Sequence, residues 1–327
     1  MKFTSFLSAA GVTLALSLAG AGAAGAQTVK IALDTAKDLE NSGTYVWAHT
    51  FSEYLNAHGM EAEEYERGAL GAEAEKMDQV QQGLLEISIS DTKGVGKLDG
   101  NILPLTLPYF LPDFDAVARG LKNGMLDKIN EGTTQQGVRV LSVTALGAAA
   151  GIFNTKHPVA KAADMADLRM RALDETQIKV YGLWGSTGTI VAWDEVPNAL
   201  QTGIADGYIN PPMVPIMFGH TGFIKHFTDA KVAIGTRTVI ASEDWYQGLS
   251  DEQRQILQDA TAAADKANMD WLASRSSELD KLREAGIEVT ELTPEAWQEF
   301  QDLTAPVYAA VPMPEGTLDA WRAATAE

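Results

Sequence analysis

The sequence contains no cysteine among its 327 residues. Disulfide bonds, thiolate zinc sites and cysteine nucleophiles are therefore excluded, whatever the redox state of the compartment. The stability of the fold must come from a buried core instead. A chain of this length can bury a large core, and it favours two lobes over one, because single cores stop growing near this size.

Positive charge is also scarce, since 25 lysine and arginine residues stand against 44 aspartate and glutamate residues, giving a net charge of −19. A surface this acidic lacks the basic patch that nucleic acid or anionic lipid would require. We therefore expect no nucleic-acid partner. The same charge opposes an anionic ligand at long range, so any anion site must be local and built from arginine.

A hydrophobic run long enough to span a membrane is missing as well. The longest apolar run lies near the N-terminus and covers only about 15 residues, whereas a membrane span needs about 20. Lys2 precedes this run and Ala24-Gly25-Ala26 follows it, an arrangement typical of a secretory signal peptide over residues 1–26. We expect export to the periplasm without direct membrane insertion, the alternative being that this segment is retained as an anchor.

Motifs for catalysis and metal binding are not found either. The five histidines show neither H-x-x-x-H nor H-E-x-x-H spacing, so a helical zinc site has no support. A nucleophile elbow at Ser186 would need glycine two positions earlier, where the chain has Trp184. We therefore expect no metal, no cofactor and no enzymatic activity. A secreted hydrolase or lyase is the alternative that a turnover assay would identify.

Strand patterns alternate with helix patterns along most of the chain. The first series comprises strands at 29–33, 61–65 and 85–89 and helices at 44–57 and 71–83. A second series begins at residue 168, with a helix near 175–184, a strand near 189–193 and a helix over 194–202. This alternation predicts an α/β fold with parallel or mixed sheets, whose ligand sites lie at the carboxyl ends of strands.

Two segments favour a hinge between the lobes. The β-prone run 138–144 leads into small residues over 145–151, and the extended run 231–242 leads back. A capping box at Ser250 opens a stretch free of proline and glycine that ends at Gly286. It predicts one helix of roughly 35 residues, about 50 Å long, that spans both lobes. We assign residues 27–148 plus 236–276 to lobe I and residues 149–235 plus 277–327 to lobe II.

The most specific pattern runs from residue 168 to residue 212, where LRMRAL is followed by AWDEVPNALQTGIADGYINPP. This order of elements resembles the solute-binding proteins of tripartite ATP-independent periplasmic (TRAP) transporters over about residues 30–303. The resemblance implies a two-lobed clamshell that captures a small organic acid and delivers it to a membrane permease. We expect a monomer. A receptor for an ABC-type importer is the alternative within the same fold class.

The resemblance also implies roles for three residues of this segment. Arg171 aligns with the family arginine that pairs bidentately with a ligand carboxylate, a geometry that lysine cannot reproduce. Asn210 aligns with an asparagine that donates to the same carboxylate, and Trp193 with an aromatic residue beside the cleft. By spacing alone, Arg169 and Arg171 could be two exposed charges. Without the resemblance, Asn210 could be a turn residue before Pro211 and Trp193 a core residue.

Three further candidates and two departures complete the prediction. Glu73 resembles a family acid at a helix start that faces the cleft, Asp174 occupies another contact position, and Arg67 could supply a second cation. Ala150 stands near the usual second arginine, and Ile209 replaces an acid that some members offer to a metal. We therefore expect a ligand with one carboxylate and no bridging metal, either a hydroxylated monocarboxylate or a zwitterion such as ectoine.

Overall fold

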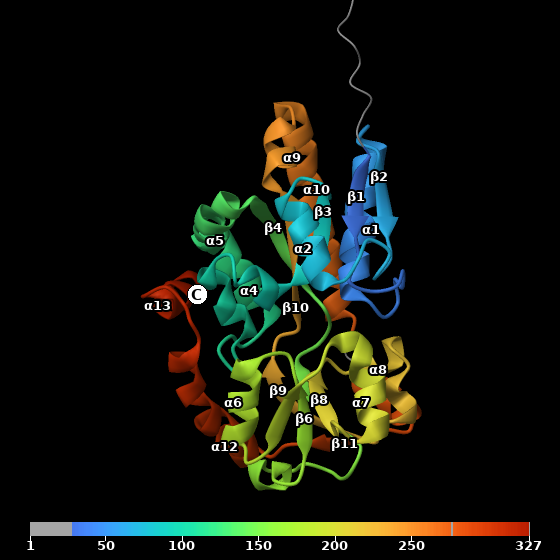
Figure 1. Ribbon diagram of the computed structural model, residues 1–327, viewed down its shortest axis with the longest axis vertical. Helices are drawn as coiled ribbons and strands as arrows, with labels where there is room; N and C mark the ends of the chain where they lie inside the picture. The colour runs from blue at the N-terminus through green and yellow to red at the C-terminus, as the bar shows by residue number, and fades with distance from the viewer. Residues whose placement is uncertain (1–27, 276, 327) are drawn as a thin grey trace, which may run out of the picture.

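The computed structural model describes residues 28–275 and 277–326 and divides into two lobes stacked along the long axis (Figure 1). Each lobe is built on one sheet. The strand order is β2-β1-β3-β10-β4 in the five-stranded sheet of lobe I and β11-β9-β5-β8-β6-β7 in the six-stranded sheet of lobe II. The predicted signal peptide lies outside the described residues.

The sheet of lobe I joins two stretches of the chain that are far apart in sequence. Strand β1 pairs in parallel with β2 and β3, whereas β10 is antiparallel to β3 and β4. The strands are β1 (Val29–Ala32), β2 (Ala62–Tyr65), β3 (Ile87–Asp91), β4 (Val138–Ala145) and β10 (Thr236–Ser242). The helices are α1 (Gly43–Ala57), α2 (Glu73–Gln81), α3 (Thr92–Val95), α4 (Phe114–Gly120), α5 (Leu126–Thr133), α9 (Glu243–Gly248) and α10 (Asp251–Ala273).

Lobe II repeats the mixed arrangement. Strand β6 is parallel to β7 and β8, while β5 is antiparallel to β8 and β9. The strands are β5 (Ala150–Asn154), β6 (Arg169–Ala172), β7 (Thr187–Ile190), β8 (Gly207–Asn210), β9 (His226–Ala233) and β11 (Glu288–Glu291). The helices are α6 (Glu175–Leu183), α7 (Val196–Thr202), α8 (Val214–Met217), α11 (Glu278–Glu284) and α12 (Pro294–Thr304).

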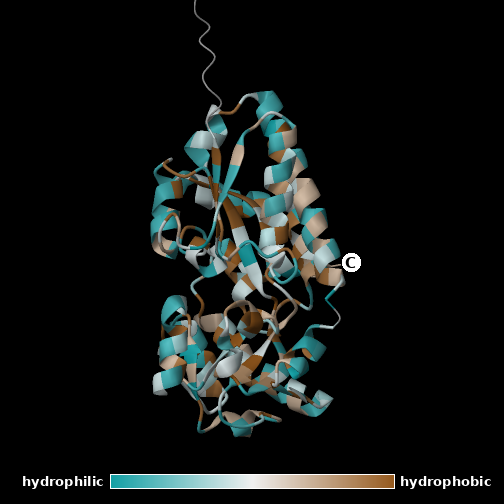
Figure 2. Ribbon diagram, turned by 90° about the vertical axis from the view of Figure 1, so that its right-hand side faces the viewer, coloured by the Kyte–Doolittle hydropathy of each residue, from teal (hydrophilic) through white to brown (hydrophobic). Residues whose placement is uncertain are grey.

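Local chemistry explains why α1 forms where the sequence predicts it. The Ser42 hydroxyl accepts a hydrogen bond from the Tyr45 N–H and caps the helix start. Trp47, Phe51 and Leu55 follow at helical spacing and are fully buried in the core of lobe I. In Figure 2, hydrophobic residues lie along several strands, and the outer helices carry both hydrophilic and hydrophobic residues, as expected of helices with one buried face.

The predicted single helix over residues 250–285 is wrong. Helix α10 ends at Ala273 after 23 residues, and α11 begins at Glu278. The Ser274 hydroxyl donates to the Trp271 carbonyl, 2.6 Å away, a local bond by which serine favours helix ends over helix interiors. Helix α10 packs on α1 in lobe I and α11 packs on β11 in lobe II, so the break falls at the boundary between the lobes.

The two segments predicted to form the hinge, residues 145–151 and 231–242, lie where the chain passes from one sheet to the other. Strand β4 ends in the first sheet at Ala145 and β5 begins in the second at Ala150, while β9 ends at Ala233 and β10 begins at Thr236.

The assignment of the C-terminal helix to lobe II is wrong. Helix α13 (Thr317–Thr325) packs on α4, and the indole of Trp321 lies in the core of lobe I. Among the described helices, none has the length and apolarity that a membrane span requires.

Candidate ligand-binding site

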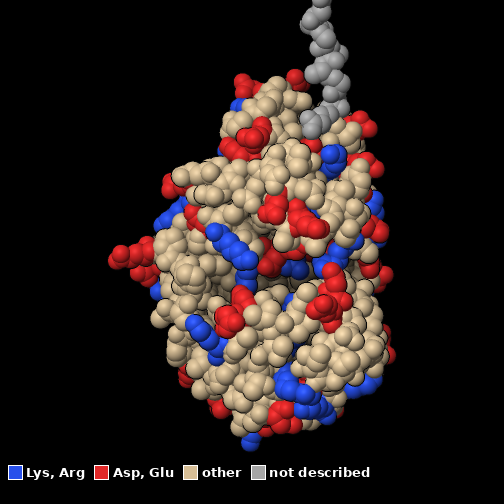
Figure 3. Space-filling view, viewed as in Figure 1, with Lys and Arg blue, Asp and Glu red and all other residues tan. Residues whose placement is uncertain are grey.

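A cleft with a free volume of about 170 Å³ lies between the lobes. It opens at the carboxyl ends of β3, β6 and β8, whose last residues or close neighbours line it, as expected for α/β sheets. The molecular surface is hollowed at this boundary, and it carries both acidic and basic side chains there (Figure 3). The cleft is therefore polar at its rim and formed by both lobes.

Arg171 enters the cleft from the end of β6. The residue is only 5% exposed, and its Nε donates to the Val191 carbonyl at 2.9 Å. Burial lowers the pKa of Arg171 to about 10, which still leaves the guanidinium charged at neutral pH. No acid in the described part of the chain forms a salt bridge with it. The site thus holds a buried cation that lacks an anionic partner among the described residues.

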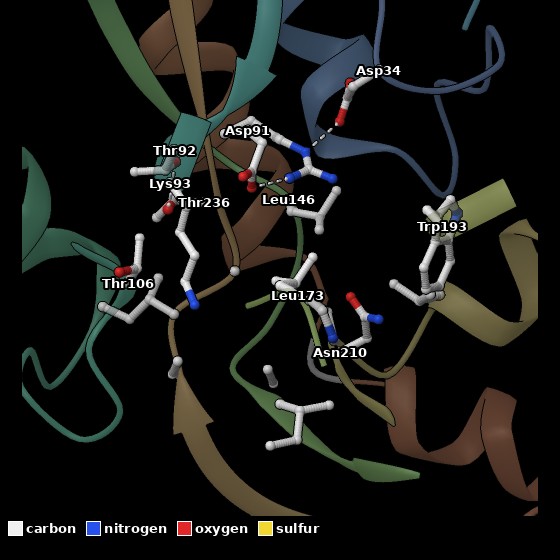
Figure 4. A pocket seen from close by; sticks show the side chains of 18 of the residues that line it. Asp34, Asp91, Thr92, Lys93, Thr106, Leu146, Leu173, Trp193, Asn210 and Thr236 are labelled. Atoms are coloured by element: carbon white, nitrogen blue, oxygen red, sulfur yellow. Dashed lines mark hydrogen bonds and ion pairs between the residues drawn. The ribbon is translucent and has the colours of Figure 1, made fainter. Parts of the chain in front are cut away.

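Asn210 and Trp193 also line the cleft, as the sequence predicts (Figure 4). Asn210 ends β8 immediately before Pro211, and β8 is the parallel neighbour of β6, so Asn210 and Arg171 line the same cleft from adjacent strands. The Trp193 ring lies 5.5 Å from the Arg171 guanidinium carbon and meets the Phe218 ring edge to face at 5.1 Å. An aromatic wall therefore stands beside the cationic group.

His220 supports this aromatic wall from behind. Its ring lies 5.2 Å from that of Trp193, and its Nδ1 lies 3.2 Å from the Tyr208 hydroxyl. Burial lowers the pKa of His220, so the imidazole is neutral at pH 7. The neutral ring packs among aromatic side chains without bringing a second charge next to Arg171.

The wall contributed by lobe I carries a paired cation. Arg237 donates from Nε to Asp34 at 3.0 Å and from a terminal nitrogen to Asp91 at 3.1 Å (Figure 4). Burial alone would lower the pKa of Arg237, but the charges of Asp34 and Asp91 raise it above its usual value. Two carboxylates share one guanidinium, so the cluster of Asp34, Asp91 and Arg237 carries one negative charge in excess.

Arg67 lines the cleft, and Asp174 lies at its edge. The Arg67 guanidinium is paired with Asp194 at 2.9 Å and also donates to the Asp34 carbonyl at 3.3 Å. Asp174 caps α6 by accepting from the Gln177 N–H at 2.9 Å, and its other oxygen lies 2.7 Å from the Lys93 ammonium. The charges of both predicted residues are therefore already engaged across the cleft.

Glu73 lies behind the cleft surface. Its carboxylate accepts from the Asp91 N–H at 2.7 Å and lies 3.4 Å from the Lys76 ammonium. Burial would raise the pKa of Glu73, but the positive charges of Lys76 and Arg237 outweigh it and hold the pKa below its usual value. Glu73 therefore stays ionised and positions the acid in front of it.

Four charged residues that the sequence did not predict as site residues also line the cleft: Asp34, Asp91, Lys93 and Arg237. Two of them could have been found from their position in the sequence, because Asp34 and Asp91 follow the carboxyl ends of two predicted strands, where parallel sheets place ligand sites. Within the described residues, no three His, Asp or Glu side chains come together as a metal site would require.

Comparisons with known proteins agree with this architecture. A match to bacterial extracellular solute-binding protein family 7 covers residues 33–312. The ectoine/5-hydroxyectoine-binding periplasmic protein of Ruegeria pomeroyi is 31% identical over 307 residues, covering 90% of this chain and 88% of the relative. The ectoine-binding periplasmic protein of Halomonas elongata is 27% identical over 277 residues, covering 81% and 80%.

Solved structures show the same fold. The periplasmic ectoine-binding protein of the Halomonas elongata TRAP transporter matches with a TM-score of 0.83 at 24% identity, over 91% of this chain and 99% of that one. A TRAP solute-binding protein of Roseobacter denitrificans with bound β-D-glucuronate matches with a TM-score of 0.81 at 22% identity, over 91% and 99%. The chain therefore belongs to bacterial extracellular solute-binding protein family 7, the solute receptors of TRAP transporters.

Proposed function

We propose that the protein is a periplasmic, monomeric receptor that captures a small zwitterion and delivers it unchanged to a TRAP membrane permease. The carboxylate of the ligand binds Arg171, and its cationic group faces Asp34 and Asp91. The observation that carries this proposal is the opposite charge of two groups in the cleft: the guanidinium of Arg171, which forms no salt bridge with a described residue, and the cluster of Asp34, Asp91 and Arg237, which has one carboxylate in excess.

The carboxylate end follows from the state of Arg171. A buried charge without a partner is costly, and a carboxylate that pairs with it removes that cost. The guanidinium presents parallel donors that match a carboxylate, and the Asn210 amide can add a further donor at the same edge. One carboxylate satisfies this part of the cleft.

The cationic end follows from the other wall. Asp34 and Asp91 together carry two negative charges against the single charge of Arg237. Asp34 is fully buried, whereas the Asp91 side chain is 27% exposed and can reach a ligand. Trp193 and Phe218 add aromatic faces, which attract delocalised or alkylated cations. Two relatives are named for binding ectoine, a zwitterion of this kind.

Binding also requires the lobes to approach each other. The ligand contacts proposed above come from both lobes, so a bound ligand stabilises the closed form over the open one. The segments 145–151 and 231–242 carry the two sheet-to-sheet crossings and are the proposed hinge. Small-angle scattering should show a smaller radius of gyration with ligand than without it.

A set of matched probes tests the proposed ligand class. The probes 4-aminobutanoate, pentanoate and glutarate share one chain length and one carboxylate, and their other ends are an ammonium, a methyl and a second carboxylate group respectively. Calorimetry should show that ectoine and 4-aminobutanoate bind more tightly than pentanoate and glutarate. The substitution Asp91→Asn should reduce the preference for 4-aminobutanoate over pentanoate roughly tenfold, since hydrogen bonds between charged groups contribute about 1.5 kcal/mol.

The exposed Asp78 on α2 supplies the matched control, because Asp78→Asn removes the same charge away from the cleft. This variant should keep the wild-type preference. Wild-type protein that binds glutarate more tightly than 4-aminobutanoate would contradict the proposed ligand class. Recovery of each bound probe chemically unchanged would support a receptor, and turnover of a probe would support the hydrolase or lyase alternative.

A further inference from the structure

Two ion pairs join the lobes across the cleft. The Arg67 guanidinium lies 2.9 Å from an oxygen of Asp194, and the Lys93 ammonium lies 2.7 Å from an oxygen of Asp174. In both pairs the cation comes from lobe I and the acid from lobe II. Both cations line the cleft, whereas the two acids lie outside its lining.

These pairs decide how much positive charge the cleft offers to a ligand. Four cations line it: Arg67, Lys93, Arg171 and Arg237. Arg237 is held by two acids of its own lobe. Arg67 and Lys93 are held by acids of the opposite lobe, which leaves Arg171 as the cation of this set without a salt bridge to any described residue.

We propose that Asp174 and Asp194 are specificity-determining residues that make the receptor reject dicarboxylates. They engage Lys93 and Arg67, so a second carboxylate in the cleft meets no free cation from the described residues that line it and remains buried without a partner. This inference rests on the proposed function, in which Arg171 takes the first carboxylate. It assigns the selectivity to residues that do not touch the ligand.

The geometry of Asp174 suits this role. One of its oxygens accepts from the Gln177 N–H as the cap of α6, which fixes the carboxylate and leaves the other oxygen for Lys93. The Lys93 side chain is 17% exposed and extends along one side of the cleft (Figure 4). The acid is thus held in place before the lobes close, and the lysine is drawn toward it.

The second pair is the weaker one. Asp194 is 75% exposed, so solvent screens its attraction for Arg67. Arg67 has another fixed contact, a hydrogen bond to the Asp34 carbonyl. Its guanidinium therefore stays near the lobe I wall when Asp194 is neutralised. We expect Asp174 to contribute more to the selectivity than Asp194.

The test compares the affinities of glutarate and 4-aminobutanoate in each variant by calorimetry. Neutralising Asp174 loosens the closed form for both probes, so the ratio of the two affinities isolates the selectivity. Asp174→Asn should shift that ratio toward glutarate by about tenfold, and Asp194→Asn by about two- to threefold. Asparagine caps helices as well as aspartate does, so the start of α6 is preserved.

Three companion variants make the result specific. Lys93→Met added to Asp174→Asn should return the ratio to its wild-type value, because the freed cation is gone. Glu175→Gln and Glu195→Gln remove the neighbouring exposed acids, for which no ion pair is found in the described structure, and should leave the ratio unchanged. Asp174→Ser, which also caps the helix, replaces Asp174→Asn if that variant does not fold.

The outcomes separate this inference from the proposed function. If Asp174→Asn leaves the ratio unchanged, or if the shift persists without Lys93, the selectivity role is overturned while carboxylate binding by Arg171 stands. If Arg171→Ala binds both probes as the wild type does, or if the wild type binds neither, the proposed function fails and the inference fails with it.

Discussion

The two walls of the cleft use the same residue type in opposite ways. On the lobe I wall, the Arg237 guanidinium lies between Asp34 and Asp91, and its charge is compensated within the fold. On the lobe II wall, Arg171 is buried with a backbone carbonyl as its hydrogen-bond acceptor. We infer from this difference that the partners of a cleft arginine, more than its presence, indicate whether it stabilises the fold or is free to bind a ligand.

Substitution of Arg171 should have the largest effect on binding. Arg171→Ala removes one partner of a buried charge pair with the ligand, at a cost of about 2 to 5 kcal/mol or roughly 30- to 5000-fold in affinity. Arg171→Lys should also bind poorly, because the planar fork is lost. Calorimetry with ectoine measures both variants against Arg169→Ala, whose guanidinium pairs with Asp206. Wild-type affinity in a folded Arg171→Ala protein would place the anchor elsewhere.

Substitution of Arg237 should instead act on the fold. Arg237→Ala leaves Asp34 and Asp91 without their shared cation, and breaking a buried pair in this way is strongly destabilising. The Arg237 side chain is 26% exposed, so we expect a loss of about 2 kcal/mol in the free energy of unfolding, below the fully buried range. Urea titration measures it. If Arg237→Ala is as stable as the wild type, Arg237 does not stabilise the fold, and the proposed difference between the two walls is contradicted.

The fold could be predicted where local chemistry decides it. The spacing of Trp47, Phe51 and Leu55 fixes the inward face of α1, which the sequence predicts over residues 44–57. The break after Ala273 was missed because no proline or glycine marks it. The placement of α13 was missed because the burial of Trp321 against lobe I is a long-range contact.

The residues of the candidate site were more predictable on the lobe II wall than on the lobe I wall, where the sequence indicated only Arg67 and Glu73. Arg171 and Asn210 belong to one continuous segment whose order of elements identifies them. The cluster on the other wall depends on the antiparallel insertion of β10 beside β3, which sets Arg237 opposite Asp91. That register joins residues 146 positions apart, and nothing in the local sequence of either strand specifies it.

Substitution of Trp193 should have an intermediate effect on binding and tests the lobe II wall, because the Trp193 ring lies beside Arg171. The ring also lines the cleft, and losing a cation–π contact with the cationic group of the ligand costs about 1 kcal/mol, so Trp193→Ala should weaken ectoine binding roughly fivefold. Trp193→Phe should retain most of the affinity. Trp297→Phe, an aromatic change on α12 away from the cleft lining, is the control. Equal affinities of Trp193→Ala and wild-type protein would remove the aromatic wall from the proposed site.

Asp265 provides the smallest and most selective test, because it is a carboxylate in lobe I that forms no salt bridge with any described residue and lies away from the cleft. Its Oδ1 accepts from the Trp47 indole N–H and the Ser142 hydroxyl, both at 2.6 Å. Burial raises the pKa of Asp265 despite these two hydrogen bonds. Unlike Arg171, this unpaired charge has no ligand to compensate it.

Because the folded-state pKa of Asp265 lies above the unfolded value, the fold favours the protonated form, and stability is lost as the pH rises from the unfolded pKa through the folded one. Asp265→Asn keeps an oxygen acceptor without the charge. It should raise the free energy of unfolding at pH 7 by about 1 kcal/mol, the usual size of one stabilising change, with ectoine affinity unchanged. This gain in stability should shrink as the pH falls below the folded pKa.

The control is Glu252→Gln, which is exposed on the same helix and should show no such pH-dependent gain. Urea titrations at pH 7 and at acidic pH measure the free energy of unfolding of each variant. A destabilised Asp265→Asn at neutral pH would mean that the hydrogen bonds to the carboxylate outweigh the cost of its burial.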